Sequence, residues 1–310
     1  MLLNIVLLCL GFYMLIKGAD ILVDGSSSLA CTFKIPTIIV GLVIVSIGTS
    51  APEAAVSIAA GVSGSNEIAI SNVIGSNIFN LLLVLGVCAF IIPLPVPRSI
   101  VKSELPLLIL FSFIITSLSL FSDIISRVDG AILLALMTLY LLWLIKDALS
   151  KRAQIKVEKP VLKLSTSILY IIVGLIAIIF GGDLVVGHAK NIALDLGMSE
   201  KLIGLSIVSI GTSLPELVTS VIAARKGNVD IAVGNIVGSC IFNLLFIIGI
   251  SSLITPISIN PQLYIDMFVM IVASILTYYF SKTRGNMNKK EGIIFVALFL
   301  LYFIFILIRN

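Results

Sequence analysis

Long apolar runs alternate with short polar segments from one end of the chain to the other. Each run has roughly the 20 residues that an α-helix needs to cross a bilayer core. Such runs predict helices, because backbone polar groups in hydrocarbon have to be hydrogen-bonded within the segment. The pattern predicts an all-α polytopic membrane protein whose ten transmembrane helices cover residues 2–30, 36–60, 67–92, 103–121, 129–148, 164–193, 200–224, 230–254, 262–281 and 291–308.

Composition agrees with this fold class. Hydrophobic residues make up 59% of the 310 and charged residues 12%, whereas a soluble domain carries about 25% charged residues. The net charge of +4 comes from loops beside the spans, so we expect membrane lipid as a partner and no nucleic acid. Residues 1–16 lack a basic region, which argues against a cleaved signal peptide. The four cysteines lack metal-ligand spacing and are expected to be small buried hydrophobes.

The two halves of the chain repeat each other. One segment occurs twice, as Gly41-Leu-Val-Ile-Val-Ser-Ile-Gly-Thr-Ser-Ala-Pro-Glu53 and as Gly204-Leu-Ser-Ile-Val-Ser-Ile-Gly-Thr-Ser-Leu-Pro-Glu216. The halves align without gaps at an offset of 163, which predicts repeats at 1–149 and 164–310 joined by a linker at 150–163. Each half holds five spans. Because five is odd, we expect the second repeat to be inverted in the membrane, with broken core helices as in many secondary transporters.

The basic residues predict the orientation of the chain. Of the 20 lysines and arginines, 15 lie in the loops between spans 1 and 2, 3 and 4, 5 and 6, 7 and 8, and 9 and 10. Cytoplasmic loops are enriched in these residues. We therefore expect an inner or plasma membrane protein with both termini outside and the 150–163 linker in the cytoplasm.

The repeated segment places one glutamate in each half at membrane depth. Glu53 and Glu216 each follow a proline at the end of an apolar run. A carboxylate at this depth is costly and by default marks a functional site. Each proline lacks an N–H and clashes with the carbonyl four residues earlier, so we expect a broken helix that lines a cavity. Around each glutamate, hydroxyl residues recur at helical spacing: Ser46, Ser50 and Ser57 with Thr49, and Ser209, Ser213 and Ser220 with Thr212.

A second pair of polar stripes lies on the third and eighth spans. Their members are four residues apart: Asn72, Ser76 and Asn80, and Asn235, Ser239 and Asn243. Together with the glutamates they offer only oxygen ligands, which suit hard cations and Ca²⁺ in particular. Taken singly, Ser57, Ser220, Asn72 and Asn235 are more typical of hydrogen bonding between helices.

Three other polar residues lie within the predicted first and sixth spans. Asp20 and Asp183 lie beside glycines in the long first and sixth spans, and we interpret them as structural hydrogen-bonding groups or parts of an access pathway. His188, the single histidine, has no carboxylate at the matching position Gly25 and is interpreted as a helix-end residue.

The paired Gly-Thr-Ser-x-Pro-Glu and Gly-Ser-x-Ile-Phe-Asn elements resemble the α-repeats of the cation/calcium antiporter superfamily, and the prokaryotic sodium/calcium exchangers most closely. The resemblance covers nearly the whole chain. It implies ten helices, exchange of Ca²⁺ for Na⁺ by alternating access, and long first and sixth helices that slide across the core. No cofactor and no protein partner is implied beyond the transported ions.

The resemblance also implies ion ligands. Glu53 and Glu216 are similar to the central carboxylates of the family. The other matching positions are Thr49, Ser50, Ser76, Thr212, Ser213 and Ser239, and the carbonyls of Ser46 and Ser209. Asn80 and Asn243 complete the expected site, and some relatives have an aspartate at one of them. Because Asn80 and Asn243 are neutral amides, the expected site has at most two negative charges, those of Glu53 and Glu216. This limit bears on the ion stoichiometry and on any K⁺ dependence.

Three alternatives to Na⁺/Ca²⁺ exchange stay open. A Ca²⁺/H⁺ antiporter could use the same glutamates to carry protons. The stretch Gly61-Val-Ser-Gly64 matches the short pattern of intramembrane serine proteases, but a four-residue match is common and a turn explains it better, so no enzyme is expected. A passive channel is disfavoured because broken helices around a carboxylate pair are typical of a closed binding site.

Overall fold

A computed structural model describes residues 1–64, 66–152, 161–198 and 209–309. Within these ranges the protein is almost entirely helical. Its regular elements are α1 (Leu2–Phe33), α2 (Thr37–Val40), η1 (Gly41–Val45), α3 (Ser46–Thr49), α4 (Ala51–Val62), α5 (Asn66–Ile78), η2 (Phe79–Val84), α6 (Leu85–Ile91), β1 (Leu94–Pro95), η3 (Ile100–Glu104), α7 (Leu105–Ser122), β2 (Ile124–Ile125), α8 (Arg127–Lys151), α9 (Leu164–Asp195), α11 (Ser209–Gly211), α12 (Leu214–Arg225), α13 (Val229–Phe242), η6 (Asn243–Ile247), α14 (Ile248–Ile254), β3 (Ile257–Ser258), α15 (Leu263–Arg284), β4 (Asn286–Met287) and α16 (Lys289–Arg309). The elements labelled η are single turns of π-helix.

Eight helices among the described residues are long and apolar enough to cross a membrane. A ninth span results if the bent pair formed by 37–49 and 51–62 is counted as one. These nine correspond to nine of the ten predicted spans. The remaining one, predicted at 200–224, begins in residues that lie outside the described ranges.

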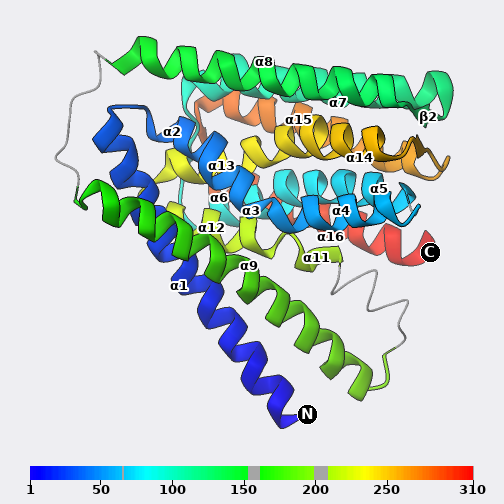
Figure 1. The fold of residues 1–310 in the computed structure, drawn as a ribbon, viewed down its shortest axis with the longest axis horizontal. Helices are drawn as coiled ribbons and strands as arrows, with labels where there is room; N and C mark the ends of the chain where they lie inside the picture. Colours follow the sequence, from blue (N-terminus) through cyan, green and yellow to red (C-terminus); the bar gives the residue numbers. More distant parts are fainter. Residues whose placement is uncertain (65, 153–160, 199–208, 310) are drawn as a thin grey trace.

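Helices α1 and α9 form an antiparallel pair that lies obliquely across the rest of the bundle (Figure 1). Glycines at seven-residue intervals bring the two backbones together. A Cβ added at Gly18 would lie 2.9 Å from the carbonyl oxygen of Gly174, and one added at Gly11 would lie 2.9 Å from that of Gly181. Small residues allow this close approach in membranes, where packing rather than the hydrophobic effect drives helix association.

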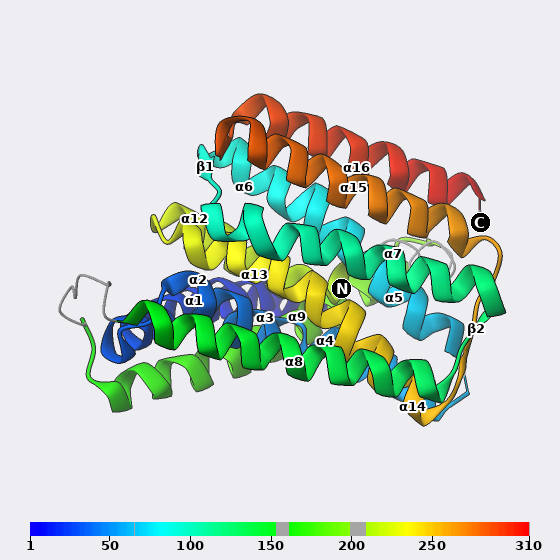
Figure 2. The same ribbon diagram turned by 90° about the horizontal axis from the view of Figure 1, so that it is seen from above.

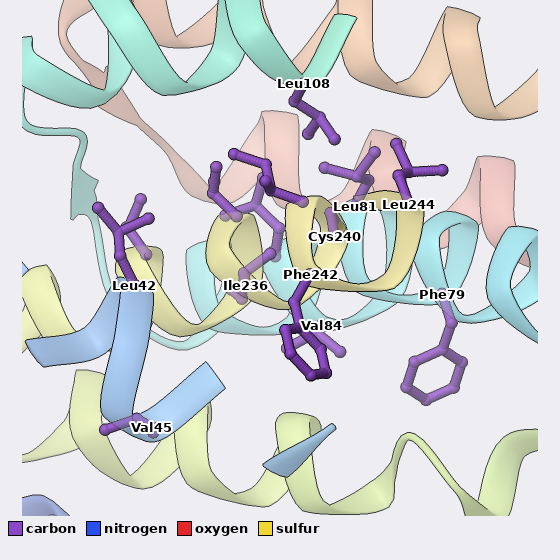
Figure 3. Packing of buried hydrophobic residues seen from close by; sticks show 14 of the residues in the cluster. Leu42, Val45, Phe79, Leu81, Val84, Leu108, Ile236, Cys240, Phe242 and Leu244 are labelled. Carbon is purple, nitrogen blue, oxygen red and sulfur yellow. The ribbon is translucent and has the colours of Figure 1, made fainter. Parts of the chain in front are cut away.

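The centre of the bundle is formed by the spans that contain α5 and α13. In the most apolar part of the span 229–254, 94% of residues are buried, and in that of 67–91 the share is 72%. Helix α16 packs beside α6, α15 beside α7, and α8 beside α14 (Figure 2). Figure 3 shows Ile236 and Leu244 in one buried cluster with Leu81 and Leu108. The polar stripes of α5 and α13 are thereby held away from lipid.

Two short antiparallel strand pairs tie the halves together. Strand β1 pairs with β4, and β2 pairs with β3. The first strand of each half pairs with the second strand of the other half, so that each half contributes one strand to each pair. This reciprocity extends to the flanking hydrogen bonds, in which the Val96 amide donates to the Gly285 carbonyl and the Ile259 amide to the Asp123 carbonyl.

The structure corrects the prediction that the halves align without gaps. Strands β1 and β3 are 163 residues apart, but β2 and β4 are 162 apart. The helix caps that follow share the shorter offset, because Ser126 pairs with Asp129 as Asn288 pairs with Glu291. The first half therefore has one more residue between its two strands than the second half, and the π-turn η3 lies in that interval. A π-turn accommodates one more residue in a helix than an α-turn does.

The α1–α9 contact generates a prediction. We expect Gly174→Ala to lower stability by about 1–3 kcal/mol, because its Cβ would meet the backbone of α1 at 2.8 Å and that contact cannot relax cheaply. Gly187→Ala is the matched control on the same helix, since a Cβ there has no atom within 4 Å. Both changes raise helix propensity equally. Thermal unfolding in detergent measures the difference, and equal melting temperatures for the two variants would contradict the packing argument.

Candidate functional site

The two predicted breaks in the core helices are present. Helix α3 ends at Thr49 and α4 begins at Ala51, with a bend of 47° between the two segments. In the second half, α11 ends at Gly211 and α12 begins at Leu214. A proline lies in the first turn of each helix that follows the break, where its missing N–H is tolerated. The breaks place Glu53 and Glu216 in the first turns of α4 and α12.

Each glutamate is hydrogen-bonded by the half of the chain to which it does not belong. The Ser50 hydroxyl donates to Glu216 Oε1 at 2.8 Å, and the Ser213 hydroxyl donates to Glu53 Oε1 at 2.9 Å. These two bonds are equivalent at the 163-residue offset. All four residues have no exposed side-chain surface. The two carboxylates therefore share one closed site at the junction of the halves.

Serines of the central helices complete the inner ring. Ser76 on α5 lies 3.1 Å from the Ser213 hydroxyl. On α13, the Ser239 hydroxyl reaches Glu216 Oε1 and the Ser46 carbonyl, each at 3.4 Å. The Ser46 carbonyl also accepts the Ser50 amide at 3.0 Å. The spans three and eight thus contribute to the same site as the broken helices.

An outer ring of amides supports this arrangement. The Asn72 amide donates to the Ser57 hydroxyl at 3.1 Å and to the Glu53 carbonyl at 3.3 Å. In the other half, the Asn235 amide donates to the Ser220 hydroxyl at 3.0 Å, while its oxygen accepts from Thr49 at 3.0 Å. These four serine and asparagine residues bond one helix to another, as their structural interpretation predicted. Thr49 is directed to Asn235 in this conformation.

Several buried oxygens of the site have no protein partner in the described part of the chain. They are Glu53 Oε2, Glu216 Oε2, Thr212 Oγ1, Asn243 Oδ1 and the side-chain oxygen of Asn80, whose nitrogen is also unpaired. A buried polar atom without a hydrogen bond is costly. Two carboxylates surrounded by neutral oxygens match the ligand preference of hard cations. The described residues contain no cluster of three or more His, Cys, Asp or Glu.

Hydrogen bonds join Ser46, Ser76 and Ser239 to the two serine–glutamate pairs, whereas no such bond to the carboxylates is made by Asn80 or Asn243 in the described residues. Ser46, Ser76, Asn80, Ser239 and Asn243 are buried, as are the residues of the two carboxylate pairs. Thr212 is half-buried at the break before α12. Ser209 begins α11, and its side chain lies outside the described part of the structure.

Sequence reasoning missed Asn77, a buried polar residue that contacts the predicted ligand Asn243. Its amide nitrogen donates to the Cys240 carbonyl at 3.2 Å, and its oxygen accepts from Asn243 Nδ2 at 3.1 Å. A signal was available, because the repeated motif reads Gly-Ser-Asn in the first half and Gly-Ser-Cys in the second. The two copies differ at this position on the central helices.

The aspartates at matching positions of α1 and α9 have different surroundings. Asp20 pairs with Lys226 at 2.7 Å, and Asp24 pairs with the same ammonium at 2.5 Å. Burial disfavours the charge of Lys226, but hydrogen bonds to Asp20 and Asp24 outweigh this effect and raise its pKa. The ion pair is therefore kept at neutral pH, and on the alkaline side it is lost as pH rises through that raised pKa. Asp183 instead lines a cavity of about 540 Å³ between α4 and α9, together with Thr212 and both helix-breaking prolines.

Other polar residues have ordinary structural surroundings. His188 Nδ1 lies 3.0 Å from Asn4 Oδ1, which joins α9 to α1. The Ser63 hydroxyl donates to the Ala60 carbonyl at the end of α4, and Gly64 has a φ of 76°, so the Gly-x-Ser-Gly stretch is a turn. All four cysteines are free thiols. Cys88 and Cys240 are buried as predicted, whereas Cys31 is only half-buried and the prediction is wrong for Cys9, which is exposed on α1.

Comparisons with known proteins agree with this geometry. The family model described as sodium/calcium exchanger protein matches residues 3–146 and 166–308. The chain is 39% identical to the inner membrane protein YrbG of Escherichia coli over 89% of this chain and 88% of that protein. It is 36% identical to the putative antiporter CaxA of Alkalimonas amylolytica over 97% and 98% of the two chains.

A solved structure is also similar. The sodium-calcium exchanger NCX_Mj, soaked with Na⁺ and Ca²⁺, superposes with a TM-score of 0.85 at 33% identity and covers 96% of this chain and 97% of its own. The family match covers most of both halves. This chain is therefore a multi-pass membrane protein that belongs to the sodium/calcium exchanger family of cation antiporters.

Proposed function

We propose that this protein exchanges Ca²⁺ for Na⁺ across the membrane by alternating access. The observation that carries the proposal is the pair of fully buried glutamates, each bonded by a serine of the opposite half and each left with one unpaired oxygen. Two negative charges in a closed site attract a divalent cation. The oxygen ligands around them suit Ca²⁺ and Na⁺ rather than softer metals.

The proposed ligands bind ions without giving up their present hydrogen bonds. The Ser50 and Ser213 hydroxyls donate their protons to the carboxylates, so each hydroxyl oxygen keeps at least one lone pair that can face a cation. The full set comprises Glu53 and Glu216, the side chains of Thr49, Ser50, Ser76, Asn80, Thr212, Ser213, Ser239 and Asn243, and the carbonyls of Ser46 and Ser209. Asn80 and Asn243 contribute oxygens without charge.

The same two charges couple the ions. A pocket that carries two bare carboxylates past an apolar barrier has a high electrostatic cost. Bound Ca²⁺ removes that cost, and so does bound Na⁺. The site therefore changes sides when loaded with either ion and rarely when empty, which is the requirement for exchange rather than leakage.

The proposed topology has ten spans arranged as two inverted repeats, 1–149 and 164–310, joined by a cytoplasmic linker at 150–163. Its support is the reciprocal strand pairing of the halves, the antiparallel α1–α9 pair and the concentration of basic residues on one side. Both termini then lie outside. Membrane lipid surrounds the bundle, because large apolar side chains are exposed along α1, α8, α9 and α16.

A Ca²⁺/H⁺ antiporter is the second candidate. The unpaired carboxylate oxygens that favour a cation can each take up a proton instead. Protons then compete with Ca²⁺ for the same atoms, because ligand carboxylates have to be ionised.

Flux into proteoliposomes separates the two candidates. We expect an imposed Na⁺ gradient to drive uptake of radiolabelled calcium with equal pH on both sides and without K⁺, because Na⁺ alone offsets the carboxylate charges. A pH gradient without Na⁺ is the control. Calcium uptake that follows the pH gradient and ignores Na⁺ would replace the proposal with proton exchange.

Neutralising either central carboxylate should abolish exchange. Glu53→Gln or Glu216→Gln removes one of the two charges that offset dehydration of the divalent ion, a loss of about 3 kcal/mol or more that reduces transport roughly 100-fold. Glu104→Gln is the matched control, because Glu104 is also a buried carboxylate in a span but lies outside the site. Size-exclusion chromatography checks folding. Near-normal calcium flux in either site variant would refute the assignment.

Labelling from outside intact cells tests the topology. In a variant whose four native cysteines are replaced by serine, a cysteine placed at Ala153 should stay unmodified by an impermeant reagent until the cells are permeabilised. The control is Leu196→Cys after the end of α9, where 67% of the leucine is exposed and the proposed topology predicts labelling at once. The reverse labelling pattern would require the opposite orientation.

A further inference from the structure

We propose that Asn77 is a positioning residue that fixes the orientation of the Asn243 amide, so that the Asn243 oxygen faces the ion site. The inference rests on the proposed function, because it assigns a role toward the transported cation. Asn77 lies on α5, is fully buried and is not one of the proposed ligands.

The orientation of Asn77 follows from its neighbours. A side-chain amide has two similar ends, and its orientation is decided by the hydrogen bonds that each end can make. One end of Asn77 lies 3.2 Å from the Cys240 carbonyl oxygen and 3.7 Å from the Met270 sulfur. Both of these neighbours act as acceptors here, and a carbonyl can only accept. That end is therefore the NH₂ group, and the other end is the oxygen.

The orientation of Asn243 follows in turn. The oxygen of Asn77 can only accept, and it lies 3.1 Å from Asn243, so the Asn243 atom that faces it is Nδ2. Asn243 Oδ1 then points the other way, is buried and has no protein partner in the described residues. Asn243 lies one helical turn beyond Ser239, whose hydroxyl reaches Glu216. The hydrogen bonds that run from the Cys240 carbonyl through the Asn77 amide to the Asn243 amide thus leave the Asn243 oxygen unpaired, one helical turn from a serine that contacts Glu216.

The other half lacks this device. The position that matches Asn77 is Cys240, whose thiol lies 3.9 Å from the Asn77 carbonyl oxygen. No geometric hydrogen bond holds the Asn80 side chain among the described residues, and its interaction with the Cys240 thiol is with a weak hydrogen-bonding group. The Asn243 amide is therefore fixed by a second amide, whereas the Asn80 amide is held less tightly. Without Asn77, the Asn243 amide can turn, and its NH₂ group then faces the cation.

A double-mutant cycle tests this role. Asn77→Leu removes the acceptor while keeping a similar side-chain volume, and we expect it to raise the KM for Ca²⁺ about tenfold in Na⁺-driven flux, with kcat little changed. Asn243→Asp supplies the matched background, because a carboxylate presents an oxygen to the ion whichever way it turns. In that background Asn77→Leu should change the KM less than twofold.

The outcomes are distinct. A tenfold rise that disappears in the Asn243→Asp background supports the positioning role. An equal rise in both backgrounds would mean that Asn77 only holds the helices together, and no rise in either would mean that the amide does not need fixing; both results overturn the proposal. If Asn77→Leu does not fold, Asn77→Ala is read in the same way. No calcium exchange by the unchanged protein would overturn the proposed function itself and, with it, this role.

Discussion

Burying two carboxylates in the middle of a membrane protein costs several kcal/mol unless each is hydrogen-bonded. In this protein the bonds run crosswise, from Ser50 to Glu216 and from Ser213 to Glu53. Neither half can satisfy its own glutamate by these bonds, so the stable unit is the two halves together. The broken helices, the central α5 and α13 and the outer asparagine ring all serve to hold these two serine–glutamate pairs at one point.

Two kinds of packing surround that point, and they meet different requirements. The central helices are enclosed by other helices, so that their polar stripes avoid lipid. Helices α1 and α9 lie outside, in contact through glycines rather than through interlocking large side chains. This close glycine contact joins α1 and α9 to each other, while the ion site lies among the broken and central helices. The outer pair and the site are thus held by different contacts.

Much of this could be read from the sequence, because a repeated motif with a carboxylate at membrane depth has few physical explanations. Glu53, Glu216 and their flanking serines were identified in this way, and the proline spacing located the breaks. The one-residue change of offset was not predictable, since a π-turn such as η3 leaves no distinct pattern of apolar residues. Asn77 was missed for another reason. A single asparagine in a helix is usually a structural hydrogen-bonding group, and only its partners reveal which way its amide points.

The ion pair between Lys226 and Asp20 makes the two halves unequal. At the 163-residue offset, Lys226 corresponds to Ser63, Asp20 to Asp183 and Asp24 to Gly187. If transport proceeds by the halves exchanging conformations, the opposite state cannot form an equivalent ion pair. A half-exposed pair of this kind contributes up to about 1 kcal/mol, which corresponds to roughly a fivefold difference in population. On the proposed mechanism, one lysine outside the ion site thus biases the equilibrium between the two conformations toward the one that contains this ion pair.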